Sequence, residues 1–233
     1  MNYIDMFNKY AKTFDLKVKA IMYKYHHSFR VMDIAHDIAV SLNLSEKDIE
    51  LASICGLFHD VGRFRQWTEY ETYYDDQSID HGDLGYDVLK EIYPNNEDKE
   101  IILQTTKHHN KYKVSDLDER TTLFCNIVRD ADKLDIIREQ ANQIKSSEIV
   151  LKEKLLDNIY NGVICENKNV KNEVDSIIRM ISWIFDYNFK YTYQFLLDKK
   201  ILENKFNLLK IYGETDEIKK LENFVYNEIE KRL

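Results

Sequence analysis

The sequence predicts an all-helical protein, and two observations support that prediction. The 233 residues include only 6 Gly and 1 Pro, so residues that break helices are scarce for this length. Apolar residues also recur with the period of an α-helix in most segments of the chain. The aromatic segment 183–195 alternates in a way that also fits a short strand, but we expect a helix there because turn signals and partner strands are missing nearby.

Local signals place the helices in chain order. Ser45, followed by Asp48, is typical of an N-cap, and Gly62 is expected to end the helix that begins there. Asp80 caps a further helix, which Pro94 stops. Residues 63–79 form an aromatic and polar connector of undefined structure, long enough to suggest a function. The expected helices lie approximately over residues 17–42, 45–62, 80–94, 98–110, 118–140 and 218–229.

The composition excludes some partners. The net charge of −8 argues against a nucleic-acid partner, because a broad basic surface would be needed to bind one. A small phosphate ester stays compatible, because a metal ion and a few local cations suffice to bind it. The first residues do not resemble a signal peptide, and no run of 18 apolar residues predicts a membrane span. We therefore expect a cytoplasmic protein without a membrane partner.

The histidines are the most informative residues. All seven lie between positions 26 and 109, and His27, His59 and His81 fall on inward faces of the expected helices. Asp60 follows His59 directly, and the segment RDADKLD contributes further acids. A lone buried imidazole is usually a satisfied core residue, but several imidazoles grouped with acids are costly to bury unless a cation neutralises them. The pattern therefore favours a metal site.

The ordered motifs HHSFRV, FHDVGRF and VRDADKLD resemble the HD-domain superfamily of metal-dependent phosphohydrolases. The segments SIDHGDLGYDVL and KHHNKY extend the similarity to one bacterial branch of HD-domain hydrolases, and the resemblance covers Tyr23 to Glu139. It implies an HD-domain helical bundle over residues 1–145. Residues 146–233 are then expected to form a C-terminal helical extension that packs on this core as one structural unit and offers a candidate contact for a homo-oligomer.

The resemblance also implies the metal ligands. His27, His59 and Asp60 match the first three ligands of the family. Asp132 fits the position of the last ligand best, with Asp130 as the alternative. The two aspartates differ by about 200° around a helix, so they cannot point the same way. Apolar residues flank both, and the helical period leaves the choice open.

A second cation is a further implication of the resemblance. His81 and His109 match positions that supply additional ligands in two-metal members, in which case Asp60 would bridge the two ions. In one-metal members, histidines near these positions contact the substrate instead, so one and two cations both stay open. Imidazole and carboxylate ligands without thiolate fit Mn, Fe, Co, Ni, Mg or Zn.

The expected activity is hydrolysis of a phosphoester of a nucleotide or a similar small phosphate compound by a metal-activated water. Arg30 and Arg63 are the candidates to bind substrate phosphate. Lys133 either does the same or pairs with a neighbouring aspartate. The residues expected to take part in catalysis are Asp60, Arg63, His81, His109 and Lys133.

Two other classes of function compete with the enzyme. The first is a regulatory HD-domain protein that binds metal and nucleotide with little or no turnover. The second is a structural helical protein with incidental histidines, which would bind no stoichiometric metal.

Overall fold

The computed structural model describes residues 2–140, 142–145, 150–211 and 215–233, and all regular secondary structure in these ranges is helical. The prediction of an all-α fold is therefore confirmed. The α-helices and short 3₁₀ helices (η) are α1 Tyr3–Ala11, α2 Lys19–Ser41, α3 Glu46–Phe58, α4 Gly62–Tyr70, η1 Asp75–Gln77, α5 His81–Ile92, α6 Lys99–His108, α7 Glu119–Glu139, α8 Glu153–Tyr160, η2 Asn167–Asn169, α9 Glu173–Ser182, η3 Trp183–Phe185, α10 Lys190–Asp198, α11 Ile201–Lys210 and α12 Asp216–Glu230.

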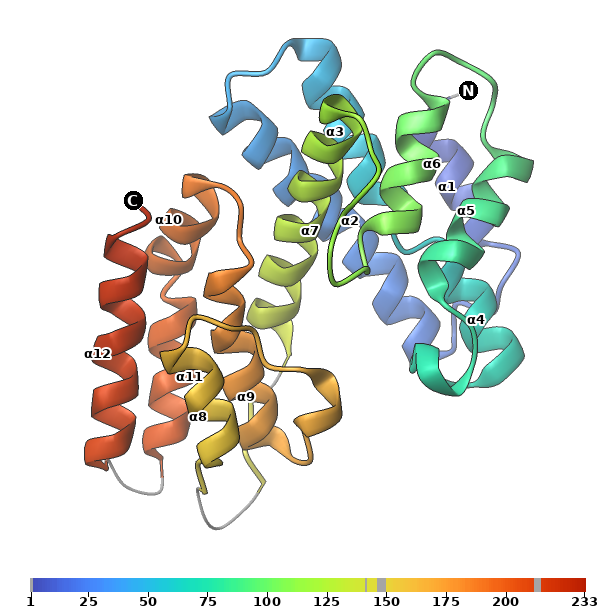
Figure 1. Ribbon diagram of the computed structural model, residues 1–233. Helices are drawn as coiled ribbons and strands as arrows, with labels where there is room; N and C mark the ends of the chain where they lie inside the picture. The colour runs from blue at the N-terminus through green and yellow to red at the C-terminus, as the bar shows by residue number, and fades with distance from the viewer. Residues whose placement is uncertain (1, 141, 146–149, 212–214) are drawn as a thin grey trace. The chain divides into compact units, whose positions relative to one another are not determined.

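The chain divides into two compact units, Met1–Asp135 and Ile136–Leu233. The division falls within α7 (Figure 1). The boundary at residue 145 and the packing of the C-terminal helices on the core stay predictions. No helix in the described part of the chain is long and apolar enough to cross a membrane.

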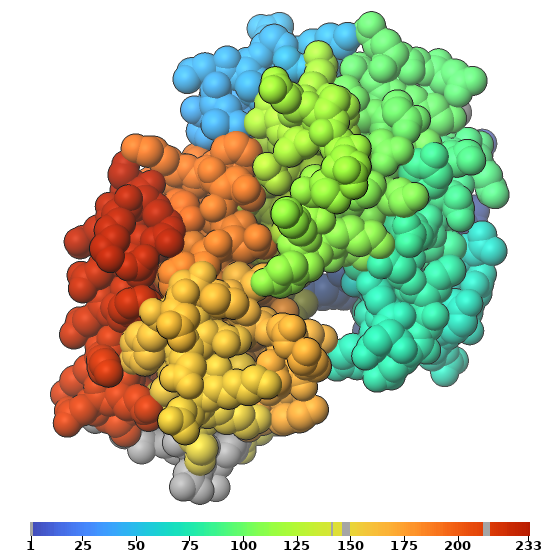
Figure 2. All heavy atoms as spheres, viewed as in Figure 1, coloured from blue at the N-terminus to red at the C-terminus, as the bar shows by residue number. Residues whose placement is uncertain are grey.

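The first unit is built around α2 and α3, which pack against each other, while α5 packs on both α4 and α6 (Figure 1). The predicted apolar stripe of α2 faces inward, since Val31, Ile34 and Ile38 are at most 4% exposed. In the space-filling view, atoms of α5 lie on the surface of this unit (Figure 2). Burial of the α2 stripe also carries His27, one turn before Val31, into the core.

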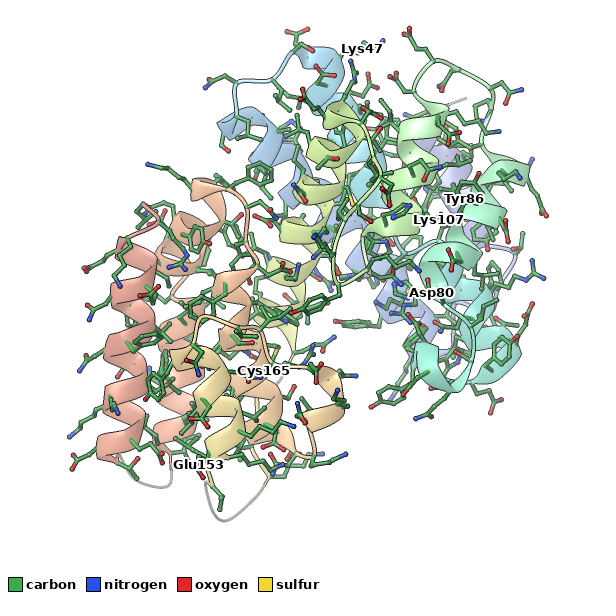
Figure 3. All side chains as sticks on the ribbon, viewed as in Figure 1. Lys47, Asp80, Tyr86, Lys107, Glu153 and Cys165 are labelled. Carbon is green, nitrogen blue, oxygen red and sulfur yellow. The ribbon has the colours of Figure 1, made fainter. Side chains whose placement is uncertain are left out.

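Two predicted N-caps are confirmed. The Ser45 hydroxyl accepts a hydrogen bond from the Asp48 backbone nitrogen at the start of α3. The Asp80 carboxylate accepts hydrogen bonds from the backbone nitrogens of Gly82 and Asp83 at the start of α5 (Figure 3). Both caps satisfy backbone donors that the first turn of a helix leaves unpaired. Asp80 thereby fixes the point at which His81 enters α5.

Gly62 has a different role from the predicted one. Helix α3 ends at Phe58, and Gly62 begins α4, so part of the expected connector is helical. A Cβ atom on Gly62 would lie 2.4 Å from the His81 carbonyl oxygen. Glycine is therefore needed here for the close approach of α4 to α5, not for a helix C-cap.

The second unit contains α8 to α12. Its last helix buries the predicted stripe completely, because the side chains of Ile218, Leu221, Val225 and Ile229 are 0% exposed. The aromatic segment 183–195 forms η3, a short extended break and then α10, with no strand among its residues. The helical expectation for this segment is thus confirmed, apart from the break.

Candidate metal centre

Three predicted ligands converge from separate parts of the first unit. His27 lies in the middle of α2, His59 follows the last residue of α3, and Asp132 lies on α7. The two imidazoles are 0% exposed, and their Nε2 atoms are 3.3 Å apart. Asp132 Oδ1 lies 3.0 Å from His27 Nε2 and 3.6 Å from His59 Nε2. We call His27 and His59 the first imidazole pair.

Hydrogen bonds fix the tautomer of both rings in the first imidazole pair. His27 Nδ1 lies 2.7 Å from Asp135 Oδ2, and His59 Nδ1 lies 2.7 Å from the Gly56 carbonyl oxygen. Both partners are acceptors, so Nδ1 carries the hydrogen and Nε2 of the neutral ring keeps a lone pair. Two lone pairs that face each other at 3.3 Å repel unless a cation or a proton lies between them. Asp132 Oδ1 is buried without a hydrogen-bond donor, and it faces the same point.

A second imidazole pair repeats this arrangement. His81 is the first residue of α5, His109 follows the last residue of α6, and their Nε2 atoms are 3.1 Å apart. His109 Nδ1 lies 2.7 Å from the Thr106 carbonyl oxygen, and His81 Nδ1 lies 2.6 Å from Asp75 Oδ2. Both Nε2 lone pairs are therefore directed at each other, as in the first pair.

Asp60 lies between the two pairs. Its Oδ2 atom is 3.5 Å from the Nε2 atoms of both His27 and His59. Its Oδ1 atom is 3.4 Å from His81 Nε2 and 3.6 Å from His109 Nε2. Ligand atoms bound at about 2.0–2.2 Å to one ion lie roughly 3–3.6 Å from each other. The side chains present therefore fit one divalent cation at each imidazole pair, with Asp60 shared.

The charges of the site favour a cation. Burial raises the pKa of Asp60, but Lys24 and the neighbouring imidazoles outweigh burial and hold it well below the usual range. Burial also raises the pKa of Asp132, but His27 and His59 outweigh burial and hold it well below the usual range. Burial and Lys24 lower the pKa of His27, whereas hydrogen bonding with its carboxylate neighbours raises that pKa to about 9. The carboxylates thus favour positive charge at His27 Nε2, and a divalent cation can supply that charge in place of a proton.

At the second imidazole pair, the pKa of the histidine that contacts a carboxylate is lowered instead of raised. Burial and the charge of Arg63 lower the pKa of His81 to about 4, so this ring is neutral near pH 7. Burial raises the pKa of Asp75, but His81 and Arg63 outweigh burial and lower it to about 2. A neutral imidazole backed by a carboxylate is the usual form of a metal-ligating histidine.

Lys24 is a site residue that the sequence prediction missed. It lies on α2 three residues before His27, is 8% exposed, and donates a hydrogen bond of 2.5 Å to Asp60 Oδ2. Its ammonium group also lies 5.6 Å from the ring centroid of Tyr73. Its place one turn before a predicted ligand was the available signal, because residues three apart share a helix face.

The other predicted site residues differ in their relation to the candidate metal centre. Asp130 is fully buried, but it does not belong to the described groups of histidines and acids close enough to share an ion, whereas Asp132 does. Lys133 lies on α7 one residue after Asp132, and its role stays a prediction. Arg30 and Arg63 both contact aspartates that hold a histidine of the site.

The fold and the two imidazole pairs define an all-α protein with a candidate histidine–aspartate metal centre. The sequence model of the HD domain matches residues 25–137. This part of the chain is similar to the HD domain, as the motifs predicted, and the HD-domain family is associated with metal-dependent phosphohydrolases. The match spans the first imidazole pair, the second pair, Asp60 and Asp132. Comparisons with curated proteins and with solved structures gave no match.

Proposed function

We propose that this protein hydrolyses a phosphoester of a nucleotide or a similar small phosphate compound. The observation that carries the proposal is the position of Asp60, which directs one carboxylate oxygen at each imidazole pair. Two cations held at a fixed separation by a shared carboxylate suit in-line attack on phosphorus. The first would be held by the first imidazole pair, Asp60 and Asp132, and the second by the second imidazole pair and Asp60.

A divalent cation at such a position supplies a water of lowered pKa and withdraws charge from a phosphoryl oxygen. The side chains of the protein orient these partners. Asp60 and Asp132 hold the negative charge of the site, and the imidazoles are fixed through Nδ1. Lys24 places an ammonium group beside Asp60, where it can donate a hydrogen bond to a phosphoryl oxygen and stabilise charge that develops in the transition state.

A nucleotide is favoured by exposed aromatic rings that lie close in sequence to residues of the site. Tyr70 and Tyr74 are 45% and 58% exposed. Tyr74 directly precedes Asp75, whose carboxylate contacts His81. An exposed ring so close in sequence to a residue of the site can stack with a base.

The experiment begins with untagged protein, so that no added histidines bind metal. Metals per chain are measured, and a panel of nucleotides and other phosphoesters is then tested with each of Mn²⁺, Co²⁺, Ni²⁺, Zn²⁺ and Mg²⁺. Asp60→Ala should remove both bound metal and turnover, while Asp87→Ala, an exposed aspartate on α5, should change neither. Metal content and turnover that survive Asp60→Ala would contradict the proposal.

The same panel separates the alternative function. A regulatory HD-domain protein would bind metal and nucleotide stoichiometrically, but its turnover would not exceed that of Asp60→Ala. Isothermal titration with a nucleotide and a matched turnover assay on the same sample distinguish the two functions.

A further inference from the structure

Each imidazole pair contains one ring held by a carbonyl oxygen and one ring held by a carboxylate. The carboxylate-held rings are His27, which contacts Asp135, and His81, which contacts Asp75. In both cases the carboxylate oxygen lies 2.6–2.7 Å from Nδ1. The two carboxylates come from different elements, and each is itself held by an arginine.

Arg30 contacts both carboxylate oxygens of Asp135. Its Nε atom donates to Oδ1 at 2.8 Å, and its Nη2 atom donates to Oδ2 at 2.9 Å. Asp135 is 0% exposed, so this two-point contact fixes a buried carboxylate. Arg30 also lies over the ring of Tyr23, which is parallel to the His27 ring at 6.1 Å. The guanidinium group therefore contacts both Asp135 and the ring that stacks on His27.

Arg63 contacts Asp75 through a single nitrogen. Its Nη1 atom lies 2.9 Å from Asp75 Oδ1, 2.7 Å from Gln66 Oε1 and 2.7 Å from the Tyr73 carbonyl oxygen. Gln66 Nε2 donates to the same Asp75 Oδ1 at 2.9 Å. Two donors thus occupy Oδ1, and Oδ2 contacts His81.

We propose that Arg30 and Arg63 are positioning residues, each of which fixes the tautomer of one metal-facing histidine through an aspartate. Each imidazole pair then has its own support, and the two cation positions can be weakened separately. This inference rests on the proposed metal centre and does not depend on hydrolysis. It gives the two arginines a role other than the phosphate contact that the sequence predicted.

Asp75→Asn is the sharpest test, because it preserves the size of the side chain. Arg63 and Gln66 both donate to Oδ1, so the amide oxygen of asparagine must take that position. Its NH₂ group then faces His81 Nδ1 and requires that atom to accept a hydrogen bond. The hydrogen of the neutral ring moves to Nε2, where it blocks the lone pair that a cation needs.

The experiment titrates the metal-free full chain with Co²⁺ alone and follows both the heat of binding and the visible absorbance of the bound ion. We expect two Co²⁺ per chain in the wild type. Asp75→Asn should weaken one of them by about 10–100-fold and leave the other close to its wild-type affinity. Arg63→Gln should weaken the same position, and Arg30→Gln should weaken the other.

The matched controls are Arg120→Gln and Asp48→Asn, which break an exposed arginine–aspartate pair of the same unit at 2.6 Å. They should leave both Co²⁺ affinities unchanged. Circular dichroism and thermal unfolding of each metal-free variant establish that it is folded.

The inference is overturned if folded Asp75→Asn keeps both affinities, or loses both to the same extent. It is also overturned if the wild type binds a single Co²⁺. A wild type that binds two Co²⁺ and shows the selective loss, yet hydrolyses no phosphoester, contradicts the proposed function and leaves the inference intact.

Discussion

Replacing Gly62 by Ala tests whether the close approach of α4 and α5 sets the second imidazole pair. The added methyl group would lie 2.4 Å from the His81 carbonyl oxygen and 2.7 Å from the Gly85 backbone nitrogen. Both neighbours are backbone atoms, so no side chain can rotate to make room. Ordinary contact begins at 3.4 Å, and α4 and α5 must therefore separate by about 1 Å.

The cost has a structural part and a functional part. Overpacking of this kind typically costs about 1–3 kcal/mol, and alanine regains at most roughly 1 kcal/mol over glycine in a helix. Subtracting that gain, we expect a net loss of about 1 kcal/mol in the free energy of unfolding. His81 Nε2 lies 3.4 Å from Asp60 Oδ1, and a shift of about 1 Å exceeds the tolerance of about 0.5 Å for a preorganised site. Co²⁺ binding at the second imidazole pair should therefore weaken, while the first imidazole pair keeps its ion.

The assay combines urea unfolding of the metal-free protein with the Co²⁺ titration. Gly85→Ala is the near control, because its methyl group mainly meets the end of the Thr106 side chain, at 2.7 Å. Gly162→Ala is the distant control. It costs about 1–2 kcal/mol because φ is +69°, and it should leave both Co²⁺ affinities unchanged. A Gly62→Ala protein with wild-type stability and two wild-type Co²⁺ affinities would refute the reasoning.

Two further predictions concern buried lysines. Lys24→Met removes an ammonium group 2.5 Å from Asp60 Oδ2. It should lower the turnover of a phosphoester substrate by about 10²-fold and tighten Co²⁺ binding by about tenfold. A merely structural Lys24 would not change these two measurements in opposite directions. Burial lowers the pKa of Lys205 from 10.5 to about 8, so the unfolded chain binds more protons between these pH values and the free energy of unfolding should rise with pH there. Lys205→Met should remove that part of the rise in urea unfolding measured from pH 7.5 to 10.5, and identical slopes in both proteins would contradict the assignment.

The helices that the sequence predicted best are those with local signals. Ser45 and Asp80 satisfy donors within three residues of themselves, so their role depends little on the rest of the fold. Helix α4 lacked such signals. Its buried residues are Gly62, Phe64 and Gln66, of which only Phe64 is large and apolar. The sequence pattern therefore indicated a polar connector where the fold has a helix.

In the candidate site, too, the sequence predicted individual residues but not the contacts between distant segments. The motifs predicted His27, His59 and Asp132 as ligands, and the fold brings these three side chains together. The partner of Arg30 could not be predicted, because Asp135 lies 105 positions away in the sequence. The sequence shows which charged residues are present, but which of them form ion pairs depends on the fold.

The aspartate of the HD motif requires one further physical explanation. Asp60 is 2% exposed, and a buried carboxylate without a partner costs several kcal/mol. Lys24 gives Asp60 a counter-ion from the protein itself. Folding of the first unit is therefore not expected to require a cation, in contrast to a zinc finger. A cation at the first imidazole pair must instead compete with an ammonium group for the same carboxylate oxygen. That competition weakens binding, and a centre of this kind is better suited to an ion that exchanges with solution than to a permanently bound structural metal.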